Sequence, residues 1–210
     1  MRKFQDYILT KYKELCEFVH DSVHHFDESH DFNHALDVTN NALIILDEEE
    51  NIQYLDFMTP DHFEKCVVYS AMLHDVCDHK YPNSIPKEEL VKFVQENFSS
   101  DESQKIIDII DSVSYSKEIK GLRKELSIPY DQVLHIVSDA DKLEAIGTKG
   151  IERCEIFGRL KGQAIPQHVI DHCHEKLLKL LPGGFFRTKS GQELAKPRHE
   201  IIVDYVKKHE

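Results

Sequence analysis

Residues 67–80 read VVYSAMLHDVCDHK, and this stretch decides how the chain is interpreted. A largely apolar run leads directly into His74 and Asp75, with Asp78 and Lys80 close behind. An ionisable pair at the end of a core-forming run is costly to bury unless something compensates it. A metal ion compensates both groups, because imidazole and carboxylate are ligands of divalent cations. The stretch therefore predicts half of a metal site, and the remaining ligands must come from elsewhere in the chain.

The composition is typical of a globular domain. The chain has 210 residues, 40% hydrophobic and 30% charged, and no apolar run is long enough to span a membrane. The N-terminal segment lacks the unbroken apolar core of a secretory signal, and the five cysteines are widely spaced without a CxxC. We therefore expect a cytoplasmic protein in a reducing compartment, without membrane association. The net charge of −12 argues against stable nucleic-acid binding but permits a small phosphate ligand.

Apolar residues recur at three- and four-residue steps along most of the chain and predict an all-α fold. Asp31 and the pair Thr59-Pro60 are the expected starts of two helices. Residues 114–127 form either a loop over the site or a short helix. The expected helices cover about residues 3–25, 32–50, 61–77, 87–97, 101–114, 131–146, 149–160, 165–181 and 188–208.

These helices are expected to form one domain over residues 1–210. Its core lies at about residues 20–160, and the helices within 165–208 pack on that core. No alternating strand pattern, internal repeat or low-complexity segment divides the sequence. The metal site is expected between the central helices of this bundle.

Four side chains on apolar helices are the candidate metal ligands. They are His34, His74, Asp75 and one of the two carboxylates Asp139 and Asp141. The helix that carries the last two is apolar nearly all round, so periodicity leaves the choice between them open. Adjacent residues on a helix point about 100° apart, so His74 and Asp75 reach one ion best where their helix ends. Two imidazoles and two carboxylates leave open positions on a five- or six-coordinate ion, as a catalytic metal requires.

Each of these features alone has an ordinary explanation. A buried histidine is more often hydrogen-bonded than metal-bound, and an aspartate on a buried helix usually pairs with a cation. The four residues together, in this order on separate apolar helices, favour a metal site. The segment HVIDHCH at residues 168–174 also has histidines four residues apart. It lacks an apolar context and an evident fourth ligand, so it is more typical of a solvated helix face than of a zinc site.

The sequence resembles the HD-domain superfamily of metal-dependent phosphohydrolases, whose pattern is a His, then His-Asp, then a distant Asp. The matching segments are HDFNHALDV at 30–38, AMLHDVCDHKY at 71–81 and SDADKLEAIGTKGIER at 138–153. Within that superfamily the chain is similar to the small stand-alone nucleotide pyrophosphohydrolase-like group. Its C-terminal segment RTKSGQELAKPRHE also resembles the C-terminal segment of that group. The resemblance implies that the fourth ligand is Asp141. Asp139 then has a supporting role, such as orienting a ligand imidazole.

The resemblance also implies a hydrolase of phosphate esters or anhydrides that uses one divalent ion. That ion is Mn²⁺ or Mg²⁺, with Fe, Co, Ni and Zn as alternatives. Lys80, Lys149 and Arg153 are expected to bind substrate phosphates, although spacing alone fits a solvated Lys80 equally well. Asp78 is either a general base or a hydrogen-bonding support. His30 either faces the cleft, where it donates to phosphate or carries a proton, or lies on the surface.

The leading expectation is a nucleoside triphosphate pyrophosphohydrolase that acts on a small-molecule nucleotide. Its rivals among enzymes are a nucleoside monophosphate phosphatase, a guanosine tetraphosphate hydrolase and a cyclic-nucleotide phosphodiesterase. A non-catalytic regulator that binds metal or nucleotide is the alternative from another class. The sequence does not fix the base or sugar preference, and it is compatible with a monomer or a homodimer.

Overall fold

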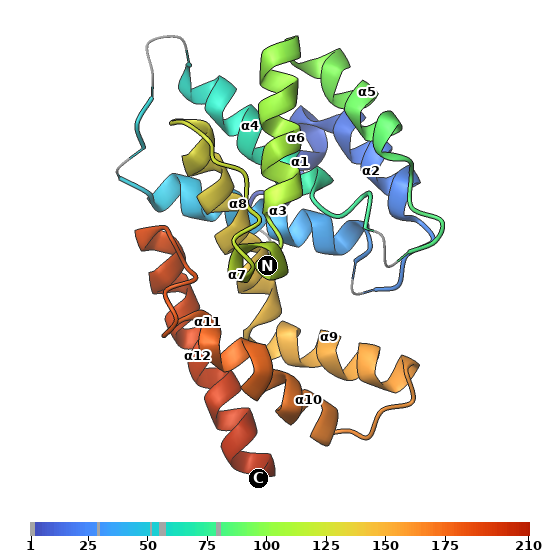
Figure 1. The fold of residues 1–210 in the computed structure, drawn as a ribbon, viewed down its shortest axis with the longest axis vertical. Helices are drawn as coiled ribbons and strands as arrows, with labels where there is room; N and C mark the ends of the chain where they lie inside the picture. The colour runs from blue at the N-terminus through green and yellow to red at the C-terminus, as the bar shows by residue number, and fades with distance from the viewer. Residues whose placement is uncertain (1–2, 29, 51, 55–57, 79–80) are drawn as a thin grey trace.

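The computed structural model describes residues 3–28, 30–50, 52–54, 58–78 and 81–210. Within these ranges every regular element is a helix (Figure 1), which confirms the predicted all-α class. The elements are α1 (Gln5–Lys11), α2 (Lys13–Val23), α3 (Phe32–Glu48), α4 (Pro60–Leu73), α5 (Lys87–Asn97), α6 (Ser100–Ser112), α7 (Tyr115–Ile119), α8 (Tyr130–Ala145), α9 (Gly147–Leu160), α10 (Gln167–His172), the π-helical turn η1 (Cys173–Leu177), α11 (Leu178–Leu180) and α12 (Lys189–His209).

Local sequence explains where the helices around the site begin. The side chain of Asp31 accepts a hydrogen bond from the backbone N–H of His34 at 3.0 Å and caps α3. Thr59 caps α4 in the same way, 3.2 Å from the backbone nitrogen of His62, and Pro60 occupies the first helical position. Both predicted helix starts are confirmed. The first cap also fixes the first turn of α3, which carries His34.

Two predicted helices are interrupted. The segment 3–25 is divided at Tyr12, where φ is −116° and ψ is 40°, so that prediction of one continuous helix is wrong. The ring of Tyr12 is buried and its hydroxyl donates to Glu64 on α4 at 2.8 Å, so a tertiary contact accompanies the break. The predicted helix 165–181 contains the turn η1, where the hydrogen-bonding pattern widens.

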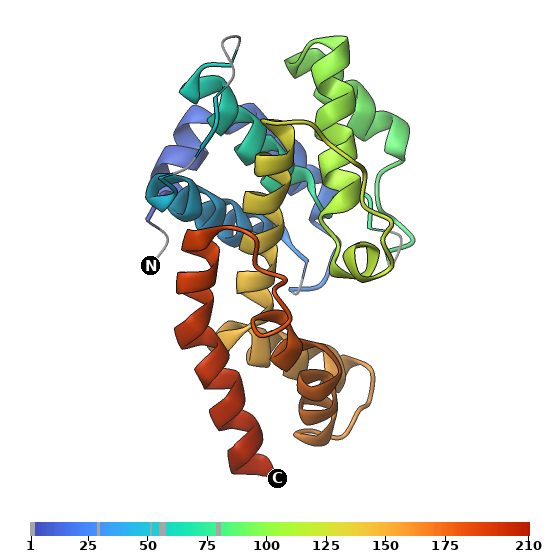
Figure 2. The same ribbon diagram turned by 60° about the vertical axis from the view of Figure 1, so that its left-hand side comes forward.

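Helices α3, α4 and α8 pack against one another at the centre of the fold. The expected deep burial of α8 is confirmed, because six of its apolar residues have exposed fractions of at most 2%: Val133, Leu134, Ile136, Val137, Ala140 and Leu143. Figures 1 and 2 show α9, α10 and α12 gathered around one end of α8, and α12 also contacts α3. In the described part of the chain, we find no helix with both the length and the apolar character needed to cross a membrane.

Candidate metal centre

The end of α4 brings His74 and Asp75 together. The helix stops at Leu73, four residues before its predicted end, and His74 is its C-cap. Nδ1 of His74 donates to the backbone oxygen of Ala71 at 2.8 Å. In the neutral ring this bond leaves the lone pair on Nε2, which lies 3.1 Å from Oδ2 of Asp75. The helix therefore ends earlier than predicted, at the point where both side chains can reach one ion.

The other two predicted ligands come from α3 and α8. Nε2 of His34 is 3.5 Å from Oδ2 of Asp75 and 3.8 Å from Oδ1 of Asp141. Nε2 of His74 is also 3.8 Å from Oδ1 of Asp141. One ligand atom from each of His34, His74 and Asp141 lies within 4.8 Å of the other two. The structure thus brings the four side chains together where α3, α4 and α8 meet, and we call them the metal cluster.

The donor atoms of the metal cluster fit a divalent cation. Ligands about 2.1 Å from an ion are separated by about 3.0 to 3.4 Å at right or tetrahedral angles. The observed nitrogen–oxygen separations of 3.1 to 3.8 Å are close to this range. Both imidazoles are only 3% exposed, and neither Nε2 has a hydrogen-bond partner in the part of the chain that the structure describes. Buried polar atoms of this kind are rare, and a cation would satisfy both of them.

The two histidines have opposite electrostatic surroundings. Burial lowers the pKa of His74, but Asp75 and Asp141 outweigh burial and raise that pKa to about 9. Burial and the nearby Arg153 lower the pKa of His34. Burial also disfavours the charged form of both carboxylates. The imidazoles nevertheless hold the pKa of Asp75 well below its usual value, and they also lower the pKa of Asp141. The metal cluster therefore attracts one positive charge between its carboxylates, which a bound metal ion would provide.

Asp139 has a different function from the one that the resemblance suggested. Its carboxylate accepts hydrogen bonds from the backbone N–H groups of Arg187 and Thr188, at 2.9 and 2.8 Å, and from the Thr188 hydroxyl at 2.8 Å. Thr188 is the N-cap of α12. The expectation that Asp139 orients a ligand imidazole is therefore wrong, because this side chain instead fastens the start of α12 to α8.

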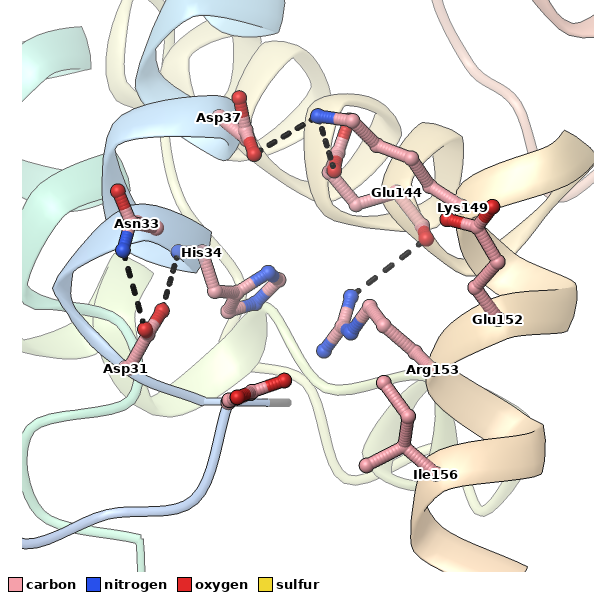
Figure 3. A pocket seen from close by; sticks show the side chains of 10 residues that line it. Asp31, Asn33, His34, Asp37, Glu144, Lys149, Glu152, Arg153 and Ile156 are labelled. Carbon is pink, nitrogen blue, oxygen red and sulfur yellow. Dashed lines mark hydrogen bonds and ion pairs between the residues drawn. The ribbon is translucent and has the colours of Figure 1, made fainter.

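A cavity of about 320 Å³ opens beside His34, between α3 and α9 (Figure 3). The guanidinium of Arg153 extends into this cavity toward the His34 ring. Lys149 also lines the cavity, but its Nζ lies 2.8 Å from Oδ2 of Asp37 and 3.6 Å from Oε2 of Glu144. Two of the three predicted phosphate-binding residues, Lys149 and Arg153, thus line one cavity next to the metal cluster. A phosphate that binds Lys149 has to compete with two carboxylates.

His30 faces the metal cluster, because its ring centroid is 5.8 Å from that of His34. Its Nδ1 lies 2.9 Å from the hydroxyl of Tyr81. Asp78 follows the HD pair in a turn, where its backbone N–H donates to the backbone oxygen of Asp75 at 3.0 Å, and it is half-buried. Lys80 lies outside the described residues. The chemical roles of His30, Asp78 and Lys80 therefore stay predictions.

Within the described ranges, the histidines of residues 168–174 do not belong to a group that could hold a metal ion. His174 pairs with Glu210 at 2.7 Å and is exposed, while Cys173 is fully buried. Among the described residues, the group suited to a metal ion is that of His34, His74 and Asp141.

Sequence analysis missed a cation that lies near the metal cluster. Lys176, on η1, is close enough to Asp141 to contribute to the lowered pKa of that carboxyl. Helical periodicity gives no signal for this placement, because Lys176 lies in a π-helical turn that interrupts the regular helical register. The nearest sequence signal is the histidine-rich segment just before it.

Comparison with known proteins agrees with this geometry. The family model described as HD domain matches residues 31–146, over half of the chain and including all four residues of the metal cluster. YpgQ of Bacillus subtilis is 29% identical over 192 residues, which cover 88% of this chain and 85% of YpgQ.

Solved structures share the fold over almost the whole chain. The crystal structure of Bacillus subtilis YpgQ in complex with ADP has a TM-score of 0.71 at 25% identity, covering 95% of this chain and 93% of that one. A structure from Lactobacillus plantarum has a TM-score of 0.74 at 24% identity and covers 95% of both chains. The match of the family model to residues 31–146 shows that the chain belongs to the HD domain family.

Proposed function

We propose that this protein is a phosphohydrolase that depends on a divalent metal ion and acts on nucleotides. Its leading activity is the release of pyrophosphate from nucleoside triphosphates. The observation that carries the proposal is the metal cluster, in which two buried imidazoles and two carboxylates converge beside a cavity. The ADP complex of YpgQ supports a nucleotide as the ligand. Mn²⁺ and Mg²⁺ are the favoured ions, and Fe, Co, Ni and Zn also suit a mixed imidazole and carboxylate set.

The residues around the metal cluster support hydrolysis at phosphorus. A bound divalent ion supplies positive charge that polarises a phosphoryl oxygen and makes water more acidic. His34, His74, Asp75 and Asp141 would hold that ion. Arg153 carries a planar guanidinium into the neighbouring cavity, where it can donate two parallel hydrogen bonds to a phosphate.

His30 is the proposed group for proton transfer. Its Nδ1 lies 2.9 Å from the hydroxyl of Tyr81, which donates to Oδ2 of Asp27 at 2.8 Å. An imidazole beside the metal cluster can take a proton from water or deliver one to a leaving oxygen. Asp78, half-buried in the turn after the HD pair, is the alternative base.

The test is a panel of nucleoside tri-, di- and monophosphates incubated with the protein and Mn²⁺. Pyrophosphate released from triphosphates is the expected result. Phosphate released only from monophosphates would favour a monophosphatase, and retained metal without turnover on any substrate would favour a binding regulator.

Variants of the cluster test the site itself. His74→Ala and Asp75→Ala should abolish both Mn²⁺ binding and turnover, since each removes a ligand. The matched control is His174→Ala, which changes an exposed histidine paired with Glu210 and should leave both unchanged. Turnover that survives either cluster variant would overturn the site assignment.

A further inference from the structure

Tyr81 follows the HD pair and is held in place where the chain turns away from α4. Its backbone N–H donates to the backbone oxygen of Asp78 at 3.0 Å. Its ring stacks on that of the buried Phe26, with ring centroids 4.0 Å apart and an interplanar angle of 10°. Stacking of this kind fixes the plane of the tyrosine ring, and therefore the direction in which its hydroxyl points.

The hydroxyl of Tyr81 joins two residues on the segment that precedes α3. It donates to Oδ2 of Asp27 at 2.8 Å and lies 2.9 Å from Nδ1 of His30. These two residues form one turn, because the backbone N–H of His30 donates to the backbone oxygen of Asp27 at 3.0 Å. The hydroxyl therefore links the segment after α4, which ends at the HD pair, to the segment before α3, which carries His34.

The ring of His30 is a neighbour of both Tyr81 and the metal cluster. Its centroid is 5.5 Å from that of Tyr81 and 5.8 Å from that of His34. A half-buried histidine in a loop has several rotamers open to it, and a hydrogen bond at Nδ1 selects the one in which that nitrogen meets the hydroxyl. A group that transfers protons loses much of its effect when it is displaced by about 1 Å. The orientation of His30 is thus the property that the hydroxyl of Tyr81 controls.

We propose that Tyr81 is a positioning residue that acts through His30, and that its hydroxyl fixes the imidazole for proton transfer beside the metal cluster. The inference rests on the proposed function, because proton transfer by His30 belongs to that function. Asp27 completes the arrangement, since its carboxylate accepts the hydrogen bond of the hydroxyl and keeps that oxygen near His30. Tyr81 makes no contact with the substrate in this proposal, so loss of its hydroxyl should change kcat and leave KM unchanged.

Removal of the hydroxyl alone tests the proposal. Tyr81→Phe keeps the ring that stacks on Phe26 and should lower kcat for a nucleoside triphosphate about tenfold, with KM within about twofold of the parent value. The matched control is Tyr54→Phe, which removes the hydroxyl of an exposed tyrosine and should alter neither quantity. A change in KM with an unchanged kcat would overturn the proposal.

The effect of Tyr81 on kcat should depend on His30. His30→Gln should itself lower kcat about a hundredfold, and Tyr81→Phe added to it should lower kcat no further. A general structural effect of the hydroxyl would lower kcat by the same factor in both backgrounds. That result would overturn the positioning role.

Nuclear magnetic resonance of the histidine rings separates this inference from the proposed activity, because it needs no turnover. In nitrogen-15 spectra, the resonance of Nδ1 of His30 should move in Tyr81→Phe, which has lost the hydroxyl beside that nitrogen, and stay in place in Tyr54→Phe. If the nucleotide panel fails while this difference holds, only the hydrolase assignment is rejected. Identical Nδ1 resonances in the parent protein and Tyr81→Phe would overturn the link between Tyr81 and His30.

Discussion

Metal binding should release about one proton per ion at pH 7. In the metal-free protein His74 holds a proton, because its pKa is about 9. His34 is neutral, because burial and Arg153 lower its pKa, and both carboxyls of the metal cluster are already ionised. A metal ion binds the lone pair of a neutral imidazole, so His74 alone has to lose its proton.

The size of this effect follows from the pKa of His74. At pH 7 the solution is two units below a pKa of about 9, and each unit corresponds to about 1.4 kcal/mol. Competition with the proton therefore weakens metal binding at pH 7 by about a hundredfold. The affinity should rise about tenfold per pH unit between pH 7 and about 9, and then level off.

The same group links stability to pH in the metal-free protein. The pKa of His74 is raised from 6.5 to about 9 on folding, so the folded state holds a proton that the unfolded state releases at lower pH. This contribution to stability is fully present below pH 6.5 and is lost as the pH rises to about 9.

Isothermal titration calorimetry measures the proton count directly. Mn²⁺ is titrated at pH 7 in buffers with different ionisation enthalpies, and the slope of observed enthalpy against buffer enthalpy gives the protons released. The control His174→Ala should give the same slope as the parent protein. A slope near zero, or an affinity that is flat between pH 7 and 8.5, would refute this account of His74. A slope of two would show that His34 is also protonated.

Three further sets of variants test other contacts. Gly191→Ala places a Cβ 2.6 Å from Oδ2 of Asp139, which is closer than the two atoms can lie. The free energy of unfolding in urea should therefore fall by about 1 to 3 kcal/mol. The Mn²⁺ affinity of the folded protein should stay unchanged. Glu118→Gln removes the counter-charge of the buried Lys142 and the half-buried Arg123. The free energy of unfolding in urea should fall by about 3 kcal/mol, and a loss below about 0.5 kcal/mol would contradict a structural role for these ion pairs. Arg153→Met should raise KM for a triphosphate about tenfold. Lys149→Met should change KM less, because Asp37 and Glu144 already pair with that ammonium. Equal effects on KM would contradict the larger contribution expected of Arg153.

Local chemistry explains why the helices and the metal cluster could be predicted from the sequence. Apolar periodicity is a property of neighbouring residues, and it gave α5 at its observed bounds and most of the other helices within a few residues. Caps such as Asp31 and Thr59 are equally local. His34, the HD pair and Asp141 are ionisable groups on apolar helices, so burial alone forces them to find partners.

The remaining features depend on partners far away in the chain. Tyr12 interrupts a helical pattern while its hydroxyl meets Glu64, 52 residues later. Lys149 looks like an available cation until folding brings Asp37 beside it. Lys176 lies in a π-helical turn, and no periodic pattern anticipates such a turn. Pairings of this kind are set by tertiary structure, and a single sequence contains no local trace of them.

The hydrogen bonds of Asp139 determine where the chain can be truncated without loss of stability. The family model ends at residue 146, yet the donors that satisfy Asp139 come from Arg187 and Thr188. A fragment of residues 31–146 would remove these donors and expose a carboxylate that is fully buried in the whole chain, two positions from Asp141. A hydrogen bond to a charged group contributes about 1.5 to 3 kcal/mol, which is a large share of the stability of any domain. The matched segment is therefore expected to be less stable alone than in the whole chain, and expression trials should keep the chain through α12.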